Sequence, residues 1–119
     1  MTAATLVDHY FEAWATTDPT RRHELVGTIF AEDATHHAAP ANVTFTGCEE
    51  IEANIARVNS ENLVRAGLGF ARGEHRENHN SIQLEWTVNT PDGTPVARGR
   101  DFLILNAEGR IAKLYMFNG

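Results

Sequence analysis

The sequence predicts an α+β fold in which three helices are followed by an antiparallel sheet. Three segments in the first half of the chain repeat apolar residues at helical spacing. From Gly67 onward the period changes to alternation, and tight hairpin turns join the later strands. Because no helix separates those strands, a parallel sheet built from βαβ units is excluded.

Length and composition predict a single globular domain, residues 1–119. The chain is 42% hydrophobic and 22% charged, which is ordinary for such a domain. Its net charge of −6 argues against binding nucleic acid or an anionic membrane, because both are negatively charged themselves. The start of the chain lacks the regions of a signal peptide, and no apolar run is long enough to span a membrane, so we expect a cytoplasmic protein. Cys48, the only cysteine, excludes an intrachain disulfide.

Two helices are expected at the beginning of the chain. The first runs roughly from Ala3 to Thr16 and has an apolar face made of Val7, Tyr10, Phe11 and Trp14. Asp18 is a favourable N-cap and Pro19 a favourable first residue for the second helix. That helix is expected to bury Leu25, Val26, Ile29 and Phe30. A turn at Glu32-Asp33 and a short strand, Ala34 to Ala38, should follow.

A third helix and a series of strands complete the expected order. Thr46 and Glu49 match the capping-box pattern that opens a helix. The apolar face of this helix is Ile51, Ile55, Val58 and Leu63. In the strand "SIQLEWTV" one face carries Ile82, Leu84, Trp86 and Val88. The turn "TPDGTP" leads into "VARGRDFLIL", and "NAEG" leads into the last strand, "RIAKLYMF".

This order of elements resembles the nuclear transport factor 2-like superfamily, and its SnoaL-like and ketosteroid-isomerase-like members most of all. The resemblance covers essentially the whole chain and rests on "YFEAWATTDPTRR", "FAEDAT", "TGCEEIEANI" and "GRDFLILNAEGRI". It implies that the three helices pack in the concave face of a curved, mixed, mainly antiparallel sheet, as a cone. The open end of that cone would hold a hydrophobic small-molecule ligand.

The same resemblance implies an oxyanion hole and a missing base. Ketosteroid isomerases use a tyrosine of the first helix and a protonated aspartic acid of a late strand to stabilise an enolate. Tyr10 in "VDHYFEAW" and Asp101 in "GRDFLIL" match these two residues. The aspartate that serves as the base in those enzymes corresponds to Ala38.

The adjacent histidines 36 and 37 are separated by the alternation of a strand. If position 38 faces the cavity, His36 does too, and His37 faces away. His36 is therefore a candidate proton acceptor in place of the lost carboxylate. The alternative, which is the more common role of a lone histidine facing a cavity, is a hydrogen-bonded residue of the cavity wall. Asp33, in the expected turn, is interpreted as structural.

Asp101 is expected to face a closed, mostly apolar cavity with a raised pKa. It shares a strand face with Leu103 and Leu105, and an unpaired buried charge is costly. The alternative is a surface carboxylate paired with Arg98 or Arg100. The cavity wall is expected to include the substrate-binding residues Trp14, Trp86, Leu114 and Met116. Met116 also stands where limonene-epoxide hydrolase, a relative, has an acidic residue, which argues against that reaction.

No motif for a cofactor or a metal is evident. The sequence has no glycine-rich phosphate loop, nucleophile elbow or redox cysteine pair, so no cofactor is expected. His75 and His79 have a four-residue spacing that would suit a metal only on a helix, and "GEHRENHNS" reads as a loop and strand edge.

Two classes of function are open. The first is an isomerase, cyclase or dehydratase (lyase) that acts through an enolate, next to a carbonyl of a polyketide- or steroid-like substrate. In it Asp101 and Tyr10 stabilise the enolate and His36 moves the proton, or Asp101 itself carries the proton, as the polyketide-cyclase branch implies. The second is a non-catalytic ligand-binding or association module. Ala38 favours the second class, and the pair Tyr10 with Asp101 favours the first.

A homodimer is expected through the outer face of the sheet. Phe102, Ile104, Tyr115 and Phe117 should point away from the core on two adjacent strands. Large apolar side chains on adjacent strands form a patch that a monomer rarely exposes.

Overall fold

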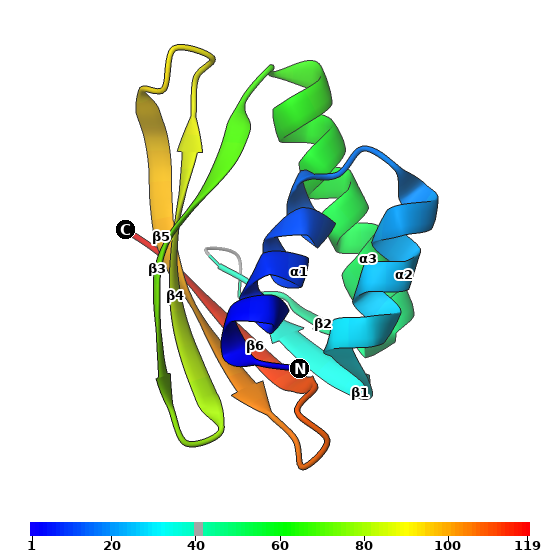
Figure 1. The fold of residues 1–119 in the computed structure, drawn as a ribbon. Helices are drawn as coiled ribbons and strands as arrows, with labels where there is room; N and C mark the ends of the chain where they lie inside the picture. The colour runs from blue at the N-terminus through cyan, green and yellow to red at the C-terminus, as the bar shows by residue number, and fades with distance from the viewer. Residues whose placement is uncertain (40–41) are drawn as a thin grey trace.

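The computed structural model describes residues 1–39 and 42–119 as one six-stranded sheet with helices against one of its faces (Figure 1). The helices are α1 (Ala3–Ala15), α2 (Pro19–Ile29) and α3 (Gly47–Asn59), which continues as the π-helix η1 (Ser60–Arg65). The strands are β1 (Phe30–His37), β2 (Thr44–Thr46), β3 (Gly69–Asn78), β4 (Ser81–Asn89), β5 (Pro95–Leu105) and β6 (Ile111–Asn118). None of these helices is both long and apolar enough to cross a membrane.

The strand order in the sheet is β2-β1-β6-β5-β4-β3. Strands β1 and β6 pair in parallel, and every other neighbouring pair is antiparallel. The three helices pack in the concave face of this curved, mixed, mainly antiparallel sheet, which does not close on itself (Figure 1). The predicted α+β fold class is therefore confirmed.

The first two helices begin where the sequence indicates. The Asp18 side chain caps α2 by accepting a hydrogen bond from the Thr20 N–H at 3.0 Å, and Pro19 is the first helical residue. The buried Arg22 of α2 donates from Nε to the Ala13 carbonyl at 3.2 Å, and its guanidinium also reaches the Thr16 carbonyl. A cation at the C-terminus of α1 satisfies carbonyls that have no partner within the helix.

A further contact fixes the end of α1 against α3. The buried Asn59 side chain donates from Nδ2 to the Trp14 carbonyl at 2.8 Å. Together with Arg22 of α2, this bond ties α1 to both other helices. The residues of α1 that face the sheet are therefore held in a defined position.

Three local predictions are wrong. Strand β1 begins at Phe30, directly after α2, so Phe30 is not helical and Glu32-Asp33 is not a turn. Both acidic residues lie exposed within β1, where its register against β6 is irregular. Thr46 is the N-cap of α3, but its side chain makes no capping bond, and its N–H bonds Glu50 Oε1 at 3.1 Å rather than Glu49.

The sequence did not predict two strands, the short β2 and the longer β3. Residues 69–78 pair with β4, with an irregular register between Arg72 and His75, although a loop and strand edge were expected for the segment that contains His75. Most side chains of β3 are exposed because the strand lies at the edge of the sheet, so it lacks the apolar alternation of a half-buried strand. His79 follows in the turn between β3 and β4, with a φ of 54°.

Candidate functional site

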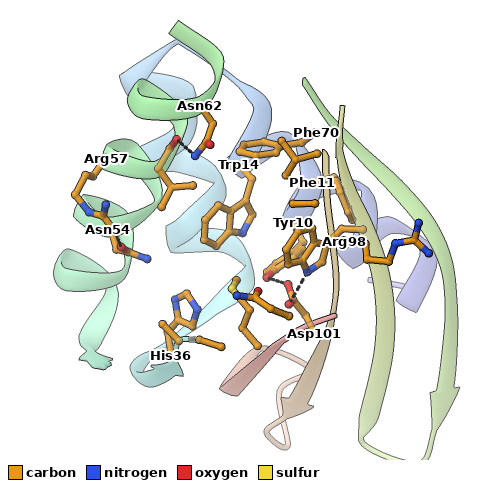
Figure 2. A pocket seen from close by; sticks show the side chains of 18 of the residues that line it. Tyr10, Phe11, Trp14, His36, Asn54, Arg57, Asn62, Phe70, Arg98 and Asp101 are labelled. Atoms are coloured by element: carbon orange, nitrogen blue, oxygen red, sulfur yellow. Dashed lines mark hydrogen bonds between the residues drawn. The ribbon is translucent and has the colours of Figure 1, made fainter. Parts of the chain in front are cut away.

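A pocket of about 640 Å³ lies between the helices and the concave face of the sheet (Figure 2). Aromatic and apolar side chains form most of its wall. The lining residues include Tyr10, Phe11 and Trp14 of α1, Val58 of α3, Phe45 of β2, Phe70 of β3, Trp86 and Val88 of β4, Asp101 of β5 and Met116 of β6. A pocket with an apolar wall and a few polar groups is typical of a small-molecule site.

The pocket reaches the surface, so the expectation of a closed cavity is wrong. The exposed residues Val43 and Arg98 are among those that line it. On the α3 side the lining includes Asn54 and Arg57, and the Arg57 guanidinium donates to Asn54 Oδ1 at 2.8 Å. A ligand therefore has a route from solvent into the pocket past polar side chains.

Asp101 is the acidic group among the described residues that line the pocket. Its side chain is buried, and both of its carboxyl oxygens accept hydrogen bonds. The Tyr10 hydroxyl donates to Oδ2 at 2.5 Å, and the Trp86 indole donates from Nε1 to Oδ1 at 2.9 Å (Figure 2). These contacts exclude the alternative in which Asp101 is a surface partner of Arg98 or Arg100.

Three elements converge to make this arrangement. Tyr10 is on the buried face of α1, and Asp101 is on the inner face of β5, together with Leu103. Trp86 lies opposite Gly99 in the β4–β5 ladder, and its indole lies across that glycine to reach Asp101 two residues further on. A side chain at position 99 would occupy the same space as the indole ring.

Burial raises the pKa of Asp101 to about 6, against the lowering effect of the hydrogen bonds from Tyr10 and Trp86. Burial, followed by the nearby Asp101 charge, also raises the pKa of the Tyr10 hydroxyl well above its usual value. A carboxyl group with a pKa close to neutrality can both accept and return a proton under physiological conditions.

His36 also lines the pocket, from the C-terminal end of β1. The residue is fully buried, and neither ring nitrogen has a hydrogen-bond partner among the described residues. Its ring lies near those of Trp14 and Phe45, at centroid distances of 5.9 and 5.8 Å. Burial lowers the pKa of His36 to about 4, so the imidazole is neutral at physiological pH. This favours a hydrogen-bonding role over that of a strong base.

His37 points the other way, as strand alternation predicts. Its ring stacks on Tyr115 at a centroid distance of 4.5 Å, and its nitrogens contact the hydroxyls of Thr35 and Thr44. His37 is not among the residues that line the pocket.

The remaining predicted residues fall into two groups. Trp14, Trp86 and Met116 line the pocket, and Ala38, which the sequence resemblance matched to the base of ketosteroid isomerases, lines it too. Leu114 is fully buried in the core between helices and sheet and does not line the pocket. The Trp14 ring lies 6.2 Å from that of Tyr10, centroid to centroid, and Trp14 opposes the rise of the Tyr10 pKa, although its indole N–H has no hydrogen-bond partner among the described residues.

Two features of the site were not predicted. Trp86 was expected only as a wall residue, yet it is a hydrogen-bond donor to Asp101. Gly99, which makes room for the indole, was not singled out. A glycine inside an otherwise regular strand is a known sign of close approach by another group, and "RGRDF" carried that sign.

Comparisons with known proteins agree with this fold, which is that of a nuclear transport factor 2-like protein. No protein-family model and no curated protein matches the chain. A solved structure from Agrobacterium tumefaciens, described as a candidate isomerase of the SnoaL-like family, matches with a TM-score of 0.86 and 30% identity. The match covers 98% of this chain and 96% of that chain. The chain therefore belongs to the SnoaL-like family.

Two structures of lower identity share the fold. A candidate polyketide cyclase from Sinorhizobium meliloti has a TM-score of 0.66 and 21% identity, covering 94% of this chain and 93% of that chain. A protein with a ketosteroid isomerase-like fold from Catenulispora acidiphila, in complex with trimethylamine, has a TM-score of 0.71 and 20% identity. That match covers 98% of this chain and 86% of that chain.

Proposed function

We propose that this protein binds a hydrophobic, polyketide- or steroid-like small molecule and moves a proton next to its carbonyl group. It would act without a cofactor, as an isomerase, cyclase or lyase. The observation that supports this most strongly is Asp101: a buried carboxyl group on the wall of an apolar pocket, with a pKa of about 6 and two hydrogen-bond donors. A buried, perturbed acid in a pocket is a candidate catalytic group.

The proposed step is a proton transfer through an enolate. The Asp101 carboxylate accepts a proton from the carbon next to the carbonyl, so that a C–H bond breaks and an O–H bond forms. The electron pair of the C–H bond moves into the enolate. Asp101 then returns the proton to another atom of the same molecule. In a ring closure, the enolate carbon first attacks a second carbonyl carbon, the π electrons of that carbonyl move to its oxygen, and Asp101 returns the proton to the alkoxide that forms. General acid–base catalysis of this kind contributes roughly 10²–10⁴-fold to a rate.

Tyr10 would assist Asp101 in both of its protonation states. When Asp101 is a carboxylate, Tyr10 donates to it, which is the arrangement described above. When Asp101 has taken the proton, the acid can donate to the Tyr10 oxygen, and the Tyr10 hydrogen becomes free to bond the enolate oxygen. The Tyr10–Asp101 pair can therefore serve two purposes. It accepts the proton while Asp101 is a carboxylate, and it becomes the oxyanion hole implied by the family resemblance once Asp101 is protonated.

Deuterium exchange tests this proposal. Small hydrophobic ketones are incubated with the protein in D₂O, and loss of their α-protons is followed by NMR. We expect the wild type to accelerate the exchange and Asp101→Asn to lower the enzymatic rate by about 100-fold or more. Arg100→Gln is the matched control, because Arg100 is exposed on the same strand and pairs with Glu85 at 3.5 Å, outside the pocket. Equal exchange rates in wild type and Asp101→Asn would contradict the role of Asp101.

The second candidate is a ligand-binding module without catalysis, and Ala38 favours it. Ala38 lines the pocket where the family's base would stand, so the pocket lacks a carboxylate at that point. A wild-type protein that binds ketones but leaves their exchange rate unchanged would support this second function over the first.

A further inference from the structure

His36 leaves two polar atoms without partners inside the pocket wall. Buried polar side chains are hydrogen-bonded in the large majority of cases. Both ring nitrogens of His36 lack a partner among the described residues, although the residue is fully buried. Its position is fixed, because β1 pairs on one side with β2, at Phe45, and on the other with β6, at Leu114.

Trp14 adds a third such atom. Its indole Nε1 is buried and has no hydrogen-bond partner within the part of the chain that the structure describes, and its ring meets the His36 ring edge-on, at an interplanar angle of 86°. Both side chains line the same pocket. Figure 2 shows the His36 ring set apart from the Tyr10–Asp101 pair, toward α3. The pocket therefore has a second polar region.

The chemistry of these atoms defines what they can bind. An indole N–H is only a donor, and a neutral imidazole has one donor nitrogen and one acceptor nitrogen. The two imidazole nitrogens point in different directions, so one ligand atom cannot satisfy both. A hydrocarbon end would leave all three unpaired, which costs binding free energy.

We propose that His36 and Trp14 form a second polar subsite for a ligand that carries, away from its reacting carbonyl, both a hydrogen-bond acceptor oxygen and a hydroxyl. This inference rests on the proposed ligand-binding function of the pocket and deepens it. It narrows the ligand from any hydrophobic molecule to an oxygenated ring ketone, with apolar surface between two polar ends. His36 is then a specificity residue, and Asp101 is the proton carrier.

The experiment measures binding of three probes of similar size. They are a hydroxy-naphthyl ketone, the matching naphthyl ketone without the hydroxyl, and naphthalene. Both tryptophans of the chain line the pocket, so their fluorescence reports on occupancy, and calorimetry gives an independent dissociation constant. The quantity compared is the affinity ratio of the hydroxy ketone to naphthalene.

In wild type we expect the hydroxy ketone to bind at least tenfold more tightly than naphthalene. His36→Phe, which keeps an aromatic ring in place, should reduce this ratio by about tenfold, the effect of one to two neutral hydrogen bonds. His36→Gln keeps a hydrogen-bond donor and an acceptor at this position, so its affinity ratio of hydroxy ketone to naphthalene should stay close to that of wild type. The control is His37→Phe, on the outer face, which should leave the ratio unchanged.

Three outcomes would overturn the inference. An unchanged ratio in His36→Phe would mean that His36 contacts only water in the complex. Removing an unpaired buried polar group is expected to be neutral or stabilising. If ligand-free His36→Phe melts at a lower temperature than wild type, the imidazole instead stabilises the folded protein. Failure of all three probes to bind wild type would overturn the proposed function as well. If Asp101→Asn loses proton exchange but keeps the affinity ratio of the hydroxy ketone to naphthalene, the result would support Asp101 as the proton carrier and His36 as a separate specificity residue.

Discussion

Gly99 and Trp86 face each other across the β4–β5 ladder, and the Trp86 indole occupies the space that a side chain at position 99 would need. This placement brings the indole N–H within 2.9 Å of Asp101 Oδ1. Trp86 can therefore be at once a wall of the pocket and a donor to its acidic group. The relationship depends on a glycine that is not among the residues lining the pocket.

Gly99→Ala should destabilise the protein by about 1–3 kcal/mol, because the new methyl group overlaps the Trp86 indole and the Phe117 carbonyl. Thermal or urea unfolding measures this change. The control is Gly27→Ala in α2, where a methyl group meets nothing within 4 Å. That substitution should stabilise by roughly 0.5–1 kcal/mol, since alanine suits a helix better than glycine does. Equal effects of the two substitutions would contradict the close approach at Gly99.

Asp101 and His36 should give opposite dependences of stability on pH. The pKa of Asp101 is about 6 in the folded state and about 3.9 when unfolded, so its stabilising contribution is complete below about pH 4 and is lost as pH rises to about 6. The pKa of His36 is about 4 when folded and about 6.5 when unfolded. Its contribution is present above about pH 6.5 and is lost as pH falls to about 4.

In wild type these two trends largely cancel, and single substitutions should reveal them. As the pH is raised from about 4 to about 6.5, the free energy of unfolding of Asp101→Asn should increase relative to that of wild type by about 3 kcal/mol. Over the same range, that of His36→Phe should decrease relative to wild type by about 3 kcal/mol. Urea unfolding at closely spaced pH values gives both curves. Curves that run parallel to wild type would show that neither pKa is shifted by folding.

Tyr10→Phe and Trp86→Phe should each raise the pKa of Asp101 further. Both hydrogen bonds stabilise the carboxylate and lower its pKa, and the bond from Tyr10 has the larger effect. The pKa of Asp101 should therefore rise more in Tyr10→Phe than in Trp86→Phe. An NMR titration of the ¹³C-labelled carboxyl group measures it, with Arg100→Gln as the unchanged reference. A lower pKa in either phenylalanine variant would rule out the proposed hydrogen bonding.

We expect the protein to form a homodimer through the outer face of the sheet. Phe102 and Phe117 lie there with their rings edge-to-face at 5.5 Å, and Phe117 is 56% exposed. Light scattering should give twice the chain mass of 13.2 kDa. Phe117→Asp should shift the protein toward monomer, because a charge at a buried contact is unfavourable.

Val64→Asp is the control for the dimer prediction. Val64 lies on η1 and not on a strand of the predicted interface, and it is 64% exposed, so its replacement should leave the mass unchanged. A wild-type protein that is monomeric at micromolar concentration would contradict the prediction.

The sequence predicted which side chains face the core in the helices and strands that have one buried face. The alternation of β5 placed Asp101 on the same inner face as Leu103, and that of β1 separated His36 from His37. Strand β3 escaped prediction because an edge strand with exposed side chains carries no such alternation. The hydrogen bond from Trp86 to Asp101 depends on the register of β4 against β5, which a single sequence does not encode locally. Leu114 was assigned to the correct face, but the pocket does not extend to it.

The position of β6 in the sheet has a consequence for how the protein is made. This strand joins β1 to β5, so β1 and the helices have no link to the strands β3–β5 through the sheet until β6 has been synthesised. Tyr10 and Asp101 are 91 residues apart in the chain, and bringing them together costs the entropy of closing that long loop. Contacts between residues so distant in the chain form slowly. On the ribosome, the Tyr10–Asp101 pair should therefore form late, and an unfinished chain would expose the apolar wall of its own binding site to other proteins.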